Sequence, residues 1–390
     1  PLLFAGALAA NAQDDITDDD LPAWLLEEEF LAESSTAPAT QAQDKLAFDV
    51  FQDVVAGKQG NVVFSPASME SLLRILQKGA GGATKEAFDK LQMGVPGVPS
   101  AMKVESADAI FAADDMNLKP VGVKDVQRVS FQQADKAAAT INDWCSEKTH
   151  GLIPQIVSPD SFDSNTRLVA TNAVYLKERW LKPFDTNNTD KNAKFTLADG
   201  TKVKTPMMRQ TDQFAYAEGA DWKAVALFYD SDGRPGEPGC FVGILPKGDA
   251  REFAATLTAE KFNSIRQALA QAGTSRTAVA LPQMEVRTEP FSLKGALSKN
   301  GLAAAFSRNS ADFSGFADEP LYLSEVVQSC YVKVDEKETV AAAVTAGIVN
   351  MRCAAPVQMN IINFDRPFIW AITDISSGAA PYFLGLYEKP

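Results

Sequence analysis

Apolar positions recur at intervals of three and four where the main body of the chain begins. Residues 44–57, DKLAFDVFQDVVAG, carry the pattern of an amphipathic helix, in which such positions share one side. The apolar members are Leu46, Phe48, Val50, Phe51, Val54 and Val55. We therefore predict a helix over this segment.

A short strand and a second helix are predicted next. Residues 62–64 are all apolar, and the following Ser65-Pro66 has the proline at an early helical position. The apolar pattern continues to the helix-ending Gly79. Ser65 and Ser68 lie at the predicted helix N-terminus, where the ordinary role of a serine is capping.

A different pattern occupies residues 336–352, EKETVAAAVTAGIVNMR, which carry no charge between 339 and 351. Most side chains there are small or β-branched, and small side chains lose little rotamer entropy on burial. In a strand, alternate side chains share a face. One face would carry Thr339, Ala341, Ala343, Thr345, Gly347, Val349 and Met351. By itself the pattern fits a loop, a buried strand or a core helix.

Composition indicates a globular protein with ample core, and charge makes nucleic acid an unexpected partner. The 390 residues are 46% hydrophobic and 22% charged, with a formal net charge of −13. Nine acidic residues and no Lys or Arg lie in 13–43, which leaves −4 for the rest. Neither part offers the basic surface that nucleic acids require.

The N-terminal region resembles an export signal followed by a tail. Residues 1–12 are apolar and end in Ala10-Asn11-Ala12, the small-x-small pattern of a cleavage site. We predict a signal-peptide remnant over 1–12, an acidic disordered tail over 13–43 and secretion, extracellular or periplasmic. No later run is long and apolar enough to span a membrane. The tail would be a solvated tether or a segment that docks on a basic protease surface.

Catalytic and metal-site signals are weak. The four cysteines fit no metal-binding spacing, and we expect no metal or other cofactor. The chain has one histidine, His150, and lacks the common nucleotide-binding, zinc-protease and serine-hydrolase motifs. We expect Cys353 to be exposed and reactive and the other cysteines to be buried thiols. The protein is therefore predicted not to be an enzyme.

Eight ordered blocks resemble the serpins, the serine-protease-inhibitor family, over nearly all of 44–390. They include NVVFSPASMESLL, INDWCSEKTHGLIPQIV, LVATNAVYLKERWLKPFD, TPMMRQ, FVGILPKG, LSKNGLAAAFSRNSADFSGF, LSEVVQSCYVKVDEKETVAAAVTAG and NFDRPFIWAITD. The resemblance implies one α+β serpin domain over 44–390, with three mostly antiparallel β-sheets and eight or nine helices. It also implies an exposed reactive-centre loop at about 337–360.

The resemblance further implies a mechanism and a target. A protease cleaves the loop and forms an acyl-enzyme, and the cut loop inserts into the largest sheet, a behaviour long established for serpins. Family register from Glu336 places the reactive bond at Arg352-Cys353. Arg in that position suits trypsin-like proteases with an acidic pocket. A register slip would make Met351 the contact residue and favour chymotrypsin- or elastase-like targets. We expect a monomeric inhibitor that forms a covalent acyl complex.

The implied hinge and the region beneath it match the family with departures. The hinge comprises Glu336, Glu338, Thr339, Ala341, Ala342, Ala343 and Thr345. Inhibitory members usually have Gly at the position of Glu338, so insertion should be slower. The polar cluster that lets the central strands part would be Ser65, Ser68, Asn172 and Gln328, the last replacing a frequent His, with Trp180 under the upper insertion point. Glu338 keeps open a non-inhibitory serpin: a carrier, chaperone or cleavable substrate.

Overall fold

The computed structural model describes residues 44–94, 102, 104–119, 126–163, 165–176, 178–234, 238–336, 359–376 and 379–390. All of them belong to one compact unit, residues 41–390. The predicted signal remnant (1–12), the acidic tail (13–43) and the segment 337–358 lie outside the described residues. The domain division, the leader and the tail therefore stay predictions.

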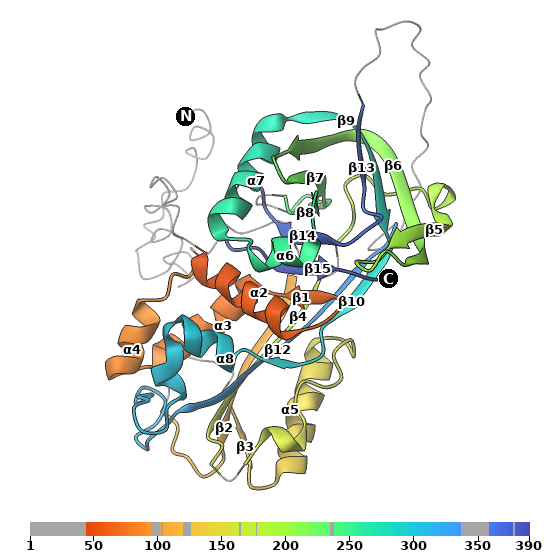
Figure 1. The fold of residues 1–390 in the computed structure, drawn as a ribbon. Helices are drawn as coiled ribbons and strands as arrows, with labels where there is room; N and C mark the ends of the chain where they lie inside the picture. Colours follow the sequence, from red (N-terminus) through yellow and green to blue (C-terminus); the bar gives the residue numbers. More distant parts are fainter. Residues whose placement is uncertain are drawn as a thin grey trace, which may run out of the picture. The chain divides into compact units, whose positions relative to one another are not determined.

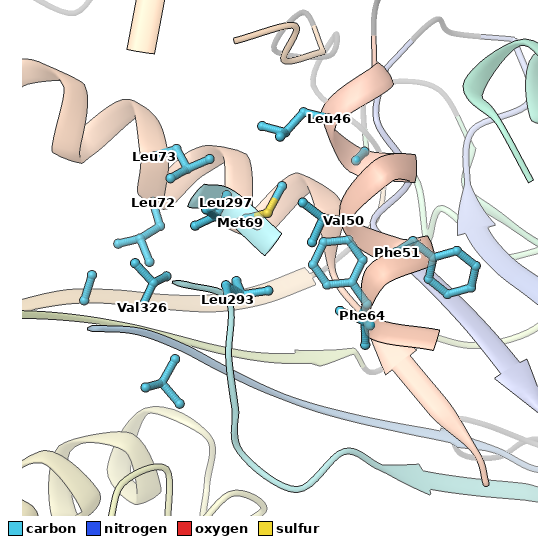
Figure 2. Packing of buried hydrophobic residues seen from close by; sticks show 14 of the residues in the cluster. Leu46, Val50, Phe51, Phe64, Met69, Leu72, Leu73, Leu293, Leu297 and Val326 are labelled. Atoms are coloured by element: carbon cyan, nitrogen blue, oxygen red, sulfur yellow. The ribbon is translucent and has the colours of Figure 1, made fainter. Parts of the chain in front are cut away.

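The first predicted elements are confirmed. Helix α2 spans Lys45–Gly57, strand β1 spans Val62–Phe64 and helix α3 spans Pro66–Gly79. Figure 2 shows apolar side chains of α2 and α3 packed together with Phe64 and Val326. Fully burying such a side chain contributes about 1.5–3 kcal/mol. The helical spacing of apolar residues thus fixes α2 and α3 against the rest of the core.

The six-stranded sheet contains the long neighbouring strands β4 and β12. Its order is β10-β12-β4-β2-β3, and β11 also pairs with β12. The strands are β2 (Val104–Ala113), β3 (Val126–Val129), β4 (Leu168–Leu176), β10 (Met284–Arg287), β11 (Phe291–Ser292) and β12 (Leu323–Val334). The long strands β4 and β12 are direct parallel neighbours, from the Leu323–Leu168 pair to the Tyr331–Tyr175 pair (Figure 1).

The second sheet has nine strands in the order β1-β15-β14-β8-β7-β6-β9-β13, with β5 paired to β6. Its further strands are β5 (Asp190–Thr196), β6 (Lys202–Glu218), β7 (Trp222–Phe228), β8 (Cys240–Pro246), β9 (Thr274–Pro282), β13 (Asn360–Asn363), β14 (Phe368–Thr373) and β15 (Phe383–Tyr387). Strand β6 pairs with β5, β7 and β9 along its length. It thereby joins two of the three expected sheets into one hydrogen-bonded sheet.

Helices cover these sheets and complete an α+β fold. The further α-helices are α4 (Gly82–Asp89), α5 (Ala134–Lys148), α6 (Ala250–Ala255), α7 (Ala259–Ala272) and α8 (Lys294–Leu297). Short helical turns are η2 (Pro159–Ser161), η3 (Thr186–Asn188), η4 (Ser298–Leu302) and η5 (Ala303–Phe306). The described residues thus hold seven α-helices. None of the helices in this part of the chain is both long and apolar enough to cross a bilayer.

Candidate functional site

Three neighbouring strands of the six-stranded sheet bring one polar residue each to the same level. The register pairs Asp108 of β2 with Asn172 of β4, and Asn172 with Gln328 of β12. The Gln328 amide donates from Nε2 to Asn172 Oδ1 at 2.6 Å. The Asn172 amide donates from Nδ2 to Asp108 Oδ1. We call Asp108, Asn172 and Gln328 the central rung.

The start of α3 closes over the central rung. The Ser65 backbone N–H donates to Gln328 Oε1 at 2.9 Å, and Gln328 Nε2 donates to the Ser65 carbonyl at 3.1 Å. Asn172 Nδ2 also donates to Ser68 Oγ. The structure therefore brings Ser65, Ser68, Asn172 and Gln328 together, as the sequence analysis expected of the polar cluster.

The capping role considered for Ser65 is wrong. Its hydroxyl makes no cap hydrogen bond to α3 and instead donates to the carbonyl of Tyr382 at 2.6 Å. A capping serine accepts from a backbone N–H of the first turn, whereas this hydroxyl is used as a donor. Ser65 thus ties α3 to the residue that precedes β15.

Burial makes the central rung energetically important. Asn172 and Gln328 are both fully buried. Leaving a buried amide partner unsatisfied costs about 1–3 kcal/mol for each group. The neighbouring Cys330 thiol is also buried, which raises its pKa, and it contacts Gln328 Oε1 at 3.5 Å. The contact between β4 and β12 is therefore made by two buried amides, and Asp108 extends the rung to β2.

A second set of contacts holds the end of β12. The buried Trp180 ring donates from Nε1 to the carbonyl of Asp335 at 2.8 Å and stacks on Tyr229 with centroids 4.8 Å apart. The Phe184 backbone N–H donates to the Glu336 carbonyl at 3.0 Å. Trp180 thus holds Asp335, the residue that directly follows β12.

The Glu336 carboxylate is buried and receives three hydrogen bonds. Gln283 Nε2 lies 2.9 and 2.7 Å from its two oxygens, and Thr189 Oγ1 donates to Oε1 at 2.5 Å. We call Trp180, Phe184, Thr189 and Gln283, which bind residues 335 and 336, the hinge anchor. Hydrogen bonds to an ionised group are stronger than those between neutral groups, so Glu336 is firmly held.

The sequence analysis missed several of these residues. Asp108, Phe184, Thr189 and Gln283 all contact predicted site residues but were not singled out. Gln283 offered a signal, because it is a polar residue directly between the apolar Leu281-Pro282 and Met284. The remaining predicted hinge residues and the reactive bond lie outside the described residues: Glu338, Thr339, Ala341, Ala342, Ala343, Thr345, Arg352 and Cys353.

The Cys145 thiol is poorly suited to nucleophilic catalysis. Burial raises the pKa of the Cys145 thiol in α5 to about 12, which disfavours the reactive thiolate. His150 follows the end of α5, and its ring faces Tyr175 at 6.2 Å between centroids. Among the described residues, no three His, Cys, Asp or Glu side chains gather closely enough to hold a metal ion.

Sequence comparison identifies the class of protein. Residues 41–110 and 100–390 match the family described as serpin (serine protease inhibitor). The chain belongs to the serpin family.

The relatives come from distant organisms. Plasminogen activator inhibitor 1 of Mus musculus is 32% identical over 376 residues, which cover 88% of this chain and 90% of the relative. An uncharacterized serpin-like protein of Thermococcus kodakarensis is also 32% identical, covering 93% of this chain and 88% of its own. Glia-derived nexin of Rattus norvegicus is 29% identical, with 87% and 91% covered.

Solved structures confirm the serpin fold. Native protease nexin-1 with heparin superposes with a TM-score of 0.76 at 24% identity, covering 90% of this chain and 98% of that one. Thyroxine-binding globulin in complex with thyroxine gives a TM-score of 0.73 at 22% identity, with 90% and 98% covered. One of these structures is named a protease nexin and the other a thyroxine-binding globulin, so the fold alone does not decide the activity.

Proposed function

We propose that this serpin inhibits serine proteases by inserting its cleaved loop between β4 and β12. One observation carries the proposal: β4 and β12 pair directly, and β12 leads through Glu336 into the segment 337–358. A strand inserted between β4 and β12 must break the hydrogen bond between Asn172 and Gln328. Residues 335 and 336, from which that strand continues, must leave the hinge anchor. The inhibitors among the curated relatives support the same function.

The composition of the segment supports insertion. Its alternating residues Thr339, Ala341, Ala343 and Thr345 are small enough to face the core between two strands. Such a strand would gain main-chain hydrogen bonds on both edges. The form before cleavage is then held by a kinetic barrier rather than by being the most stable arrangement.

The covalent step follows from ordinary serine-protease chemistry. The hydroxyl of the protease serine attacks the carbonyl carbon of Arg352, and an ester forms as the peptide bond to Cys353 breaks. The proton passes through the protease histidine to the new amino group of Cys353. An acidic specificity pocket binds the Arg352 guanidinium, so we propose trypsin-like enzymes as targets. Contact through Met351 would favour chymotrypsin- or elastase-like enzymes.

A non-inhibitory serpin is the second candidate, and Glu338 favours it. Glu lacks the backbone freedom of the usual Gly and adds a charge where insertion begins. Slow insertion gives the protease time to hydrolyse the ester, so the protein would act as a cleavable substrate. A carrier or chaperone would need no loop insertion.

A denaturing gel after mixing with trypsin tests the proposal. We expect an SDS-resistant complex, because the ester is trapped when the loop inserts. Arg352→Ala should abolish this complex, whereas Arg308→Ala, which changes an exposed Arg elsewhere, should leave it intact. Cleavage after Arg352 with full recovery of trypsin activity would refute inhibition. A complex that persists in Arg352→Ala would show that the register is wrong.

We also propose that the protein is secreted. In addition, we propose that residues 13–43 dock on a basic surface of the target protease. The nine acids of this segment supply the charge, and such attraction raises association rates at low salt. Deleting 13–43 should therefore slow complex formation in low salt and have little effect in high salt. An unchanged low-salt rate would leave the segment a simple tether.

A further inference from the structure

Strand β13 presents an apolar side chain to solvent at the end of the nine-stranded sheet. It is the last strand in the sheet order and pairs with β9 (Figure 1). Alternation along β13 buries Ile362, whereas the preceding Ile361 is 52% exposed. Met359, directly before the strand, is 43% exposed. Among the described residues the one other exposed large apolar side chain is Leu181, between β4 and β5, so two of the three lie together at the start of β13.

The neighbouring strand adds an unpaired cation to this surface. Ile361 pairs in register with Ala278 of β9, and Arg276 lies two residues before Ala278 on the same face. Arg276 is exposed and forms no ion pair with any residue in the described part of the chain. The small side chain of Ala278 leaves Ile361 open to a partner. We call Met359, Ile361 and Arg276 the β13 patch.

The length of chain between the proposed reactive bond and β13 brings a bound protease to this patch. Cys353 and Met359 are six positions apart, and six extended residues span at most about 20 Å. A protease domain of about 200 residues is about 40 Å across, which exceeds this reach. By contrast, Glu336 and Arg352 are 16 positions apart, a reach of up to about 55 Å. A protease that holds the bond is therefore tethered more closely to β13 than to the hinge anchor.

We propose that the β13 patch is a second contact surface for the target protease and binds an apolar area beside a carboxylate on that protease. The exposed parts of Met359 and Ile361 would leave water on contact, and the Arg276 guanidinium suits an acidic group. Such contacts hold the bond near the protease active site and so speed its cleavage. The inference rests on the proposed function for the position of the cleaved bond, and it requires no loop insertion.

The rate of cleavage after Arg352 tests the patch, with trypsin as the probe. The second-order rate constant is measured from the appearance of fragment 353–390 on a denaturing gel. We expect Met359→Ser combined with Ile361→Thr to lower it about tenfold, because two half-exposed apolar side chains lose their contact. Threonine is β-branched and keeps the strand preference of position 361. An unchanged rate would overturn the proposal.

Leu181→Ser is the matched control, since it removes an equally exposed apolar side chain outside the β13 patch. It should leave the rate of cleavage after Arg352 unchanged. Equal slowing in this variant and in the patch variant would also overturn the proposal, because the effect would then not depend on where the apolar side chain lies.

Arg276→Ala tests the cation separately. At low salt it should slow cleavage about threefold, and the loss should shrink at high salt, because contacts between exposed charges are screened. Arg308→Ala removes an exposed Arg outside both sheets and should keep the original rate at either salt concentration. A loss that salt does not change, or an equal loss in Arg308→Ala, would refute the carboxylate assigned to the protease.

The fate of the acyl-enzyme separates the β13 patch from the proposed function. Cleavage that slows in the patch variant but ends in hydrolysis would refute inhibition and leave the patch in place. An SDS-resistant complex that forms at the same rate in every variant would support inhibition and overturn the patch.

Sedimentation of the protein alone tests a second copy as the occupant of the patch. We expect a monomer for the original protein and for the patch variant. A dimer that Ile361→Thr abolishes would overturn the assignment to the protease and make the patch a contact between two copies.

Discussion

The central rung and the hinge anchor fasten the same strand, β12, by different chemistry. The central rung joins β12 sideways to β4 through neutral amides that are fully buried. The hinge anchor instead binds the end of β12 through a carboxylate and two main-chain carbonyls, using partners outside the six-stranded sheet. The central rung joins neighbouring strands, whereas the hinge anchor holds Asp335 and Glu336 in place.

This difference implies that the two regions fail in different ways. Loss of a rung amide leaves several buried partners unsatisfied at once, because each amide serves more than one neighbour. Loss of one anchor contact leaves the others in place. We therefore expect global destabilisation from the central rung and local loosening from the hinge anchor.

Gln328→Leu should have the largest effect. It removes the hydrogen bonds from Gln328 to Asn172 and to both backbone groups of Ser65. We expect the free energy of unfolding to fall by about 3 kcal/mol, since buried polar groups lose their partners. Urea unfolding measures the change, with the part-buried Gln52→Leu as control. A loss no greater than that of the control would contradict the importance assigned to the rung.

The free energy of unfolding should depend on pH through two buried carboxyl groups, one of them in α3, the helix that contacts the central rung. Burial raises the pKa of Glu70, near the start of α3, to about 7, and burial raises that of Asp44 to about 6. In both cases the folded protein holds its proton more tightly than the unfolded chain. The resulting stabilisation is complete below about pH 4 and is lost as pH rises through 6 to 7.

Glu70→Gln should remove most of this slope. The loss from pH 5 to pH 8 in the original protein is expected to be on the order of 2 kcal/mol. Urea unfolding across that range measures it, and Glu86→Gln in the exposed part of α4 serves as control. An equal slope in Glu70→Gln and in the original protein would show that Glu70 is not responsible.

Glu336→Ala should produce a smaller, local effect. It removes the carboxylate that accepts hydrogen bonds from Gln283 and Thr189. We expect a loss of about 2 kcal/mol, because hydrogen bonds to charged groups contribute about 1.5–3 kcal/mol. Exchange of the Phe184 N–H should accelerate more than exchange within β4. Equal acceleration in both places would remove the distinction between anchor and rung.

Trp180→Phe should have the smallest effect. It deletes the Nε1 donor to Asp335 and keeps an aromatic ring beside Tyr229. One lost neutral hydrogen bond predicts about 1 kcal/mol. Thermal unfolding detects the change, and Trp222→Phe provides a comparison in β7. A loss as large as that of Gln328→Leu would place Trp180 among the residues essential to the whole fold.

The sequence predicted the elements and the polar cluster better than the anchoring contacts. Periodicity identified α2 and α3, while the family resemblance identified Asn172 and Gln328. Neither could show that Thr189 and Gln283, 94 positions apart along the sequence, meet at one carboxylate. Local patterns report which face of an element is buried, but such contacts depend on how distant strands are placed.

The sheets show a similar limit. Strand β6 has an ordinary alternating pattern for much of its length, yet it pairs with three different strands in succession. Alternation reveals a face and contains no information about which partner lies at each edge. That two of the expected sheets are joined into one could therefore be learned only from the structure.

The parallel pairing of β4 and β12 also has a consequence for the number of hydrogen-bond ladders in the sheet. Separating them breaks one ladder, the run of pairs from Leu168–Leu323 to Tyr175–Tyr331. A strand placed between them would form two, one along each exposed edge. Under the proposed insertion the sheet would therefore gain one ladder of hydrogen bonds, and the side chains that join β4 to β12 must separate first.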